Sequence, residues 1–213
     1  MGLLTIKNAE IYFEGCRVPK QNLLGELGQG LNIAYSALID GRLSVAAGCI
    51  GVMKDCLNET LNHAKSRRQH GSQLAKKQLI QQHISRIIVG MESVKWLTYK
   101  AACARQKLHD YVQEFKLEQE GWQSKLNRNN GEYSILRNEA DRLTAIAKFH
   151  STNTAFDCAN RSVQVFGSFG YQKTARVAKH FLDSRATMIY EGANEVLELK
   201  IASEVQGESF KAY

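Results

Sequence analysis

Proline is nearly absent from this chain of 213 residues, in which Pro19 is the only one. Because proline is the residue that most reliably interrupts a helix, long stretches of the sequence are free to be helical. The length suits one domain with a sizeable core better than two. Apolar residues at 44% and charged residues at 23% are normal for a globular protein. Composition therefore favours a single, mostly helical domain.

Other absences exclude whole classes of protein. The five cysteines are odd in number and never form a C-x-x-C pair, which disfavours a disulfide framework or a zinc site. This usage favours a reducing compartment, the cytoplasm or the mitochondrial matrix. We find no signal-peptide pattern and no apolar run of about 18 residues, so no membrane span is expected. The net charge of +7 comes without a block of like charges or a nucleic-acid motif, and it equally suits an anionic ligand such as a dinucleotide or CoA.

The start of the chain differs in pattern from the rest. Residues 9–13 are rich in β-branched and aromatic side chains and predict one or two short strands within 4–18. Glycines at 25, 28 and 30 then predict a loop. We therefore expect residues 1–30 to be the end of a β-domain with its linker, and residues 31–213 to be a helical domain.

Apolar residues then recur at spacings of three, four and seven, the pattern of amphipathic helices. It predicts long helices over 31–66, from beyond Gly71 to about 106, and over 135–165. Two shorter helices are expected, over 174–183 and from Asn194, as N-cap, to Val205. Residues 107–134 are polar and predict a partly helical insertion with a turn at 129–131. The expected fold is all-α, an up-and-down four-helix bundle with a short N-terminal β segment.

Five short motifs stand in a fixed order along the chain. Their order and spacing resemble the C-terminal helical domain of the acyl-CoA dehydrogenase family, and the resemblance covers almost the whole chain except about 107–134. The motifs are Val18-Pro19 with Asn22 to Glu26, Gly41-Arg42, Arg67 to Gly71 with Gln78, Gln164 to Tyr171, and Asp183 to Arg185 followed by Ile189 to Gly192.

The resemblance assigns the catalytic base to Glu191. In this family a carboxylate removes the α-proton of an acyl-CoA while the β-carbon delivers hydride to the flavin N5 of FAD, so the base is best placed in an apolar pocket. Some members place the base on the first long helix instead, at the position of Gly41, where this chain has no side chain. By itself, a glutamate before a helix is most often a solvated loop residue.

The same resemblance implies the remaining site residues. Arg67 matches the arginine that contacts the FAD pyrophosphate across a subunit interface, where a guanidinium offers paired donors. Gln164, Gly167 and Ser168 match a loop that lies against the neighbouring subunit's FAD. His70 and Gln78 are expected near the adenosine, and Ala193 and Glu195 near the flavin, although Ala193 replaces the threonine usual in the family. Arg42, Tyr190 and Gly192 are expected to contact the acyl-CoA substrate.

The resemblance also implies partners. The family's full subunit has further domains that shield the flavin, so we expect this chain to be incomplete as an enzyme and to need a homodimer or homotetramer, or a separate chain supplying the other domains. A non-catalytic oligomerisation module of the same origin is the alternative. A basic nucleic-acid-binding protein is disfavoured, and another substrate on the same fold stays open.

Overall fold

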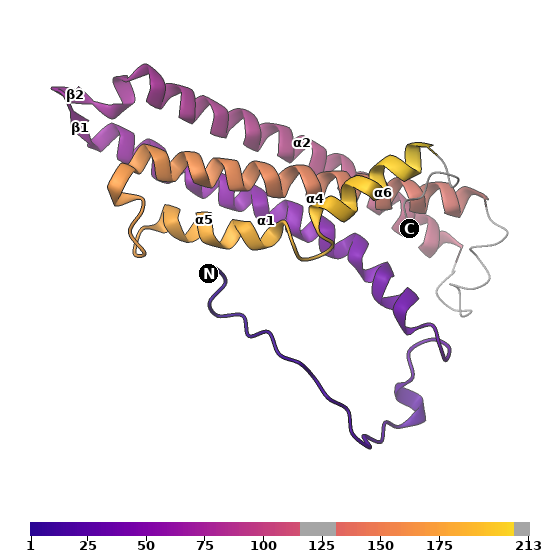
Figure 1. Ribbon diagram of the computed structural model, residues 1–213. Helices are drawn as coiled ribbons and strands as arrows, with labels where there is room; N and C mark the ends of the chain where they lie inside the picture. Colours follow the sequence, from indigo (N-terminus) through magenta and orange to yellow (C-terminus); the bar gives the residue numbers. More distant parts are fainter. Residues whose placement is uncertain (116–130, 207–213) are drawn as a thin grey trace.

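The chain folds into an elongated helical bundle, seen here in a computed structural model that describes residues 1–115 and 131–206. Three long helices form its body, α1 (Gly30–Ser66), α2 (Gln78–Glu114) and α4 (Gly131–Phe166), and α2 runs antiparallel to the other two (Figure 1). The shorter helices α5 (Arg176–Thr187) and α6 (Asn194–Gln206) follow each other along α4 and together complete the bundle (Figure 1). The predicted up-and-down helical bundle is confirmed.

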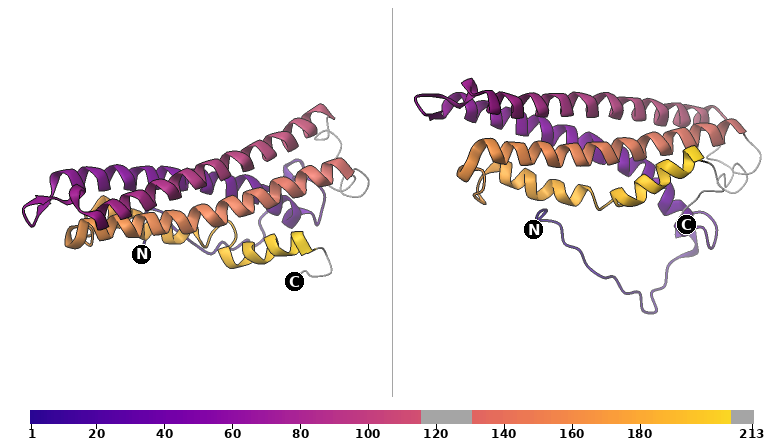
Figure 2. Two further views of the ribbon diagram at one scale, coloured as in Figure 1. Left: turned by 90° about the horizontal axis from the view of Figure 1, so that it is seen from above. Right: turned by 45° about the horizontal axis from the view of Figure 1, so that its top comes forward.

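The core of the bundle lies where α4 packs against both α1 and α2, and both views of Figure 2 show these three helices side by side. Small side chains dominate it, and they allow the helix backbones to approach closely. One buried cluster surrounds Ala46, Ala101 and Ala147, and a second contains Cys49, Met53 and Val94. Most residues of the predicted apolar stripes face these clusters. Leu79 and Ile88 do not, because the inward face of α2 is narrower than its apolar stripe.

A glycine of α2, Gly90, faces α4 at short range. A Cβ atom added to Gly90 would lie 2.7 Å from Cγ2 of Thr154, whereas one added to Gly48 on α1 meets no atom within 4 Å. We expect Gly90→Ala to destabilise the fold by about 1–2 kcal/mol, because the clash exceeds the gain in helix propensity. Gly48→Ala should instead stabilise it by about 0.5–1 kcal/mol. Urea unfolding of the two variants measures this, and the same sign for both would contradict it.

A short hairpin between α1 and α2 was not anticipated from the sequence. Strands β1 (Arg68–Gln69) and β2 (Ser72–Gln73) pair antiparallel, with Gln69 opposite Ser72. The two turn residues His70 and Gly71 have φ values of 50° and 77°. Two successive positive φ values define the tight hairpin turn that matches the twist of the strands. The short η2 (Leu74–Lys76) then leads into α2.

The strands predicted within residues 4–18 are wrong. This segment is an extended arm with no strand pairing, and it bows away from the bundle before η1 (Lys20–Asn22) and α1 (Figure 1). A strand needs a neighbour for its backbone hydrogen bonds, and the described part of the chain offers none here. The arm touches the bundle near its start, where the Leu3 amide donates to Asp183 Oδ1 at 2.7 Å.

Several helix boundaries also differ from expectation. α2 continues to Glu114, and α4 begins at Gly131, so the helical part of the predicted insertion belongs to the long helices. The rest of that insertion, with the predicted turn at 129 and 130, lies outside the described residues. The predicted N-cap is one residue too late: the carbonyl of Ala193 accepts the first α6 hydrogen bond, from Leu197 at 3.1 Å, and Asn194 is already helical.

One helix differs from the expectation that no segment is long and apolar enough to span a membrane. Among the described residues, α1 is the single helix whose length and apolar composition would suffice to cross a membrane. In the structure α1 is a bundle helix packed on α4 and α2, and its inward face carries Arg42, which forms an ion pair with Asp141 on α4.

Candidate active site

The loop between α5 and α6 has an unusual backbone. Glu191 and Gly192 both have positive φ values, 57° and 94°, and Glu191 is one of three such non-glycine residues in the described part of the chain. A side chain makes this left-handed conformation unfavourable, so neighbouring contacts must hold Glu191 in it. The loop begins where the Ile189 and Tyr190 amides donate to the Ala186 carbonyl, at 2.9 and 3.3 Å.

The carboxylate of Glu191 lies directly against Gly41 of α1. A Cβ atom added to Gly41 would lie only 2.6 Å from the carboxyl carbon of Glu191, and closer still to Oε2. The space that any larger residue would fill on α1 is therefore occupied by the carboxylate. Gly41 has no side chain to supply a base, and the Glu191 carboxylate occupies the space that such a side chain would fill.

Arg42, the neighbour of Gly41, is buried with only 7% of its surface exposed. Its Nη1 donates to Asp141 Oδ1 at 2.7 Å, and its Nε donates to the Glu191 carbonyl at 3.3 Å. Asp141 also forms an ion pair with Lys200 of α6. Arg42 therefore links α1, α4 and the Glu191 loop, and its guanidinium is committed to protein atoms.

A fully buried lysine holds the other side of the same loop. Lys148 of α4 is 0% exposed, and its Nζ donates to the Gly192 carbonyl at 2.7 Å and to Asn194 Oδ1 at 2.9 Å. Burial lowers the pKa of Lys148 to about 8. Lys148 is not among the site residues predicted from the sequence. The available signal was its spacing, since Lys148 lies four residues from Thr144 and from Thr152 on the inward face of α4.

The remaining residues of the loop are more open. Tyr190 is 42% exposed, and partial burial raises the pKa of its phenol, with the nearby Cys49 and Glu191 adding to the rise. Glu195 is exposed in the first turn of α6, close enough to Lys148 to favour its charged form. Ala193 contributes its carbonyl to the start of α6. The structure thus gathers Arg42, Tyr190, Glu191, Gly192, Ala193 and Glu195 around a single loop.

The other predicted cofactor residues lie at the hairpin end of the bundle. Arg67 directly follows α1, and His70 stands at the tip of the hairpin; both are exposed. Stacking of the His63 and Phe166 rings, with centroids 4.1 Å apart, joins this end of α1 to the end of α4. Burial and the charge of Arg67 lower the pKa of His63. An exposed set of predicted residues completes this end: Gln78, Gln164, Gly167 and Ser168.

The two groups of predicted residues do not form one site within the chain. Gly41 lies eleven residues inside α1 and Arg67 directly follows its last residue, so the two are roughly 40 Å apart at the rise of a helix. Gly167 has a φ of 62° and begins η4 (Gly167–Phe169), where a Cβ would meet no atom within 4 Å. The hairpin end is therefore an open surface with exposed backbone and a guanidinium, and it is far from Glu191.

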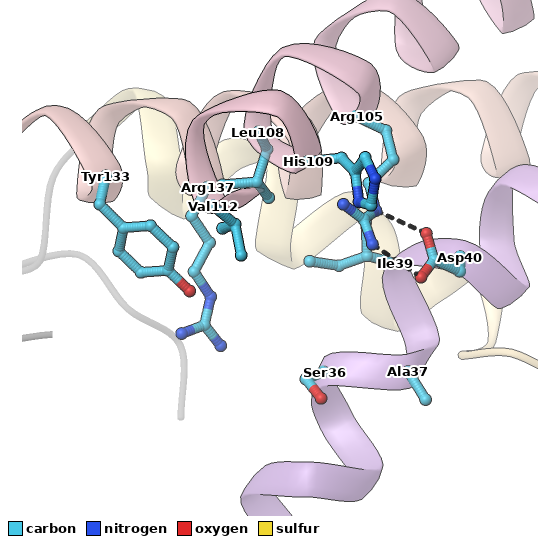
Figure 3. Close-up of a pocket in the computed structure, with 10 residues that line it drawn as sticks. All are labelled: Ser36, Ala37, Ile39, Asp40, Arg105, Leu108, His109, Val112, Tyr133 and Arg137. Carbon is cyan, nitrogen blue, oxygen red and sulfur yellow. Dashed lines mark hydrogen bonds and ion pairs between the residues drawn. The ribbon is translucent and has the colours of Figure 1, made fainter. Parts of the chain in front are cut away.

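A cleft of about 220 Å³ opens near the start of α1, at the end of the bundle opposite the hairpin. Asp40, the residue before Gly41, lies on its wall and accepts two hydrogen bonds from Arg105, at 2.6 and 3.0 Å (Figure 3). His109, Tyr133 and Arg137 also line it. The cleft thus has a mixed lining, in which the apolar side chains Ile39, Leu108 and Val112 lie beside the Asp40–Arg105 ion pair, and it begins one residue from the Glu191 contact.

Fold and site together define a helical-bundle domain that presents a glutamate from a left-handed loop to a glycine on its first long helix. The family model described as "Acyl-CoA dehydrogenase, C-terminal domain" matches residues 28–118 and 124–206. The chain therefore belongs to the acyl-CoA dehydrogenase family and contains the C-terminal domain of that family.

Relatives and solved structures agree with this assignment. The chain is 32% identical over 196 residues to the short-chain-specific acyl-CoA dehydrogenase of Megasphaera elsdenii, and 30% identical over 214 residues to the mitochondrial short-chain-specific enzyme of Sus scrofa. These alignments cover 92% and 100% of the chain but 44% of each relative. The butyryl-CoA dehydrogenase structure from Megasphaera elsdenii superposes with a TM-score of 0.70 at 31% identity, covering 89% of this chain and 42% of that one. The chain thus spans less than half the length of these relatives.

Proposed function

We propose that this chain is the catalytic-base domain of an FAD-dependent acyl-CoA dehydrogenase, with Glu191 as the base that removes the α-proton of the acyl-CoA. The contact between the Glu191 carboxylate and Gly41 carries this proposal. Bound FAD would supply the acceptor for hydride from the β-carbon. Support also comes from a structure of a glutaryl-CoA dehydrogenase with glutaryl-CoA, similar at a TM-score of 0.71 and 28% identity over 92% of this chain.

The geometry around Glu191 fits a base that must keep one position through the reaction. Arg42 fixes its carbonyl, and Gly41 leaves room for its carboxylate. A base is effective only when it is held within hydrogen-bonding reach of the proton that it removes. Arg42 then acts on the substrate only indirectly, by placing the loop. Tyr190 and Gly192 flank the base and would line the acyl thioester.

FAD fits the hairpin end as part of a site, not as a whole one. The exposed guanidinium of Arg67 suits a pyrophosphate, and the open turns at Gly71 and Gly167 leave backbone uncovered by side chains. His70, Gln78, Gln164 and Ser168 add polar groups at the same end. Ala193 and Glu195 lie near Glu191 instead. They would contact a second FAD, the one in the active site where Glu191 of this chain acts as base. This division supports a cofactor shared between subunits.

A titration of the purified chain with FAD, followed by flavin fluorescence and visible absorbance, tests this assignment. We expect saturable binding that Arg67→Ala weakens about tenfold or more, since a hydrogen bond to a charged group is lost. Lys54→Ala, an exposed lysine on the middle of α1, is the matched control and should bind like the unaltered chain. Equal binding by the Arg67→Ala variant, or no saturable binding, would contradict the assignment.

We also propose that the chain forms a homodimer or homotetramer. Large apolar side chains on α2 remain exposed, among them Leu79 (74%), Val89 (67%) and Trp96 (67%). Uncovered apolar side chains along one helix are typical of an interaction surface. Sedimentation equilibrium should give a mass that is a multiple of 23.9 kDa. A monomer at all concentrations would contradict the proposal.

The exposed α2 face also favours a second candidate, a non-catalytic assembly module that keeps the bundle and its interface. The two candidates differ in flavin binding. Oligomers that bind no FAD would favour the assembly module, whereas FAD binding that depends on Arg67 favours the dehydrogenase domain.

A further inference from the structure

Lys148 is the largest fully buried side chain of the described residues, and nothing in the proposed reaction uses it. A buried ammonium group is unfavourable unless its hydrogen bonds are satisfied. Within residues 1–115 and 131–206, Lys148 forms no salt bridge with a carboxylate. Its partners are a backbone carbonyl and a side-chain amide instead. The position of this charge therefore calls for a role other than ion pairing.

Lys148, Thr152 and Asn194 are joined in a ring of hydrogen bonds, which we name the Lys148 clamp. The lysine donates to Asn194 Oδ1, and Asn194 Nδ2 donates to Thr152 Oγ1 at 3.0 Å. The Thr152 hydroxyl is in turn bonded to the Lys148 carbonyl at 2.9 Å. All three side chains are buried. The amide of Asn194 cannot rotate without losing both contacts, so Lys148 has a rigid second partner.

The clamp grips the loop at the residue that follows the base. Lys148 Nζ holds the carbonyl of Gly192, while Arg42 Nε holds the preceding carbonyl, that of Glu191. Two successive carbonyl oxygens thus each accept a hydrogen bond from a buried cation, one from α1 and one from α4. The two residues whose carbonyls are held, Glu191 and Gly192, are also the ones with positive φ values, 57° and 94°.

We propose that Lys148 is a positioning residue for Glu191: its ammonium group holds the Gly192 carbonyl, with Asn194 as anchor, and thereby keeps Glu191 in the left-handed conformation that sets its carboxylate against Gly41. All contacts of this positioning lie within one chain, so it requires no partner or cofactor. Its consequence for catalysis rests on the proposed function of Glu191 as base.

Hydrogen exchange of the full chain with Lys148→Met tests the positioning. Methionine has a similar length and no charge, so the bundle should keep or gain stability while the loop loses its donor. We expect amides in 188–197 to exchange about 10- to 100-fold faster, from the loss of charge-assisted hydrogen bonds. Amides in α2 should be unchanged. Unchanged exchange in 188–197, or a uniform increase over all helices, would overturn the proposal.

A double-mutant cycle separates the clamp from a general effect on stability. Asn194→Ala removes the anchor, and because it acts on the same contact, its effect on loop exchange should be much less than additive with Lys148→Met. Thr60→Val, which removes a buried hydrogen bond to Ser162 of 3.0 Å elsewhere on α1, is the matched control. Its effect should add to that of Lys148→Met. Additive behaviour of Lys148→Met and Asn194→Ala would contradict a shared clamp.

Failure of the positioning and failure of the proposed function are distinguishable. In the FAD-loaded assembly, a homo-oligomer or a complex with a chain that supplies the other domains, exchange of the acyl-CoA α-proton with solvent deuterium reports Glu191 as base. Lys148→Met should lower its rate at saturating substrate about tenfold or more with little change in KM, since the base is misplaced but the substrate contacts remain. A change in KM alone would overturn the catalytic consequence. If the unaltered chain exchanges no α-proton, the function fails, and hydrogen exchange in 188–197 still decides the positioning.

Discussion

Gly41→Ala is expected to slow removal of the acyl-CoA α-proton about 100-fold, although Gly41 carries no reacting group. The added methyl carbon would fall within 2.6 Å of the Glu191 carboxyl carbon, so the carboxylate must move. The backbone on both sides is held, because position 41 lies within a long helix and the Glu191 carbonyl is bound by Arg42, so it is the flexible end of the Glu191 side chain that moves. A shift of about 1 Å in a catalytic group costs on the order of 100-fold in rate. Solvent deuterium exchange into acyl-CoA, catalysed by the FAD-loaded homo-oligomer or by the complex with a chain that supplies the other domains, measures the effect.

The matched control is Gly51→Ala, on the same helix, where a Cβ would meet no atom within 4 Å. It should leave the exchange rate unchanged and stabilise α1 slightly. Glu191→Gln should abolish the exchange while leaving the fold intact, since the amide keeps the shape of the carboxylate but cannot take the proton. A Gly41→Ala variant with the rate of the unaltered chain would show that the base does not need its place against α1.

The free energy of unfolding is expected to rise between pH 8 and about pH 10.5 through the titration of Lys148. Burial lowers the folded-state pKa of Lys148 from 10.5 to about 8, so in this window the folded chain has released a proton that the unfolded chain retains. Stability rises with pH wherever the unfolded state binds more protons, and the gain here is on the order of 3 kcal/mol. Below pH 8 both states are charged, and the burial cost is present in full.

The charged and titratable groups that face Lys148 set the size of this effect. Cys49, Glu195 and Glu191 favour its charged form, and Arg42 disfavours it, but burial exceeds them all. Denaturant unfolding at pH 7, 8, 9 and 10 should show the rise in the unaltered chain and not in Lys148→Met. Other titrating groups are shared by both chains and cancel in the difference. Lys173→Met, an exposed lysine, should behave like the unaltered chain. Parallel curves for all three chains would contradict the prediction.

Much of the fold could be predicted from the sequence because helices are encoded locally. With a single proline in the chain, the apolar spacing alone placed α1 and α4 within a few residues of their observed ends. The arm at 4–18 was mispredicted because strand formation depends on a partner that local sequence does not reveal. The hairpin at 68–73 was missed because its strands are too short to carry a pattern, although His70-Gly71 marks the turn.

The motifs of the sequence by themselves determined the family and the residues Arg42, Arg67 and Glu191 as candidates, since each motif is a short local string. Only the tertiary structure decided how these residues combine. It set Glu191 against Gly41, 150 positions earlier in the chain, placed Lys148 under the same loop, and left Arg67 and Gly167 at a distant end. The physical reason is that such contacts depend on the packing of the long helices against one another and on which loop carbonyls a buried cation reaches. The residue spacing within one segment determines neither.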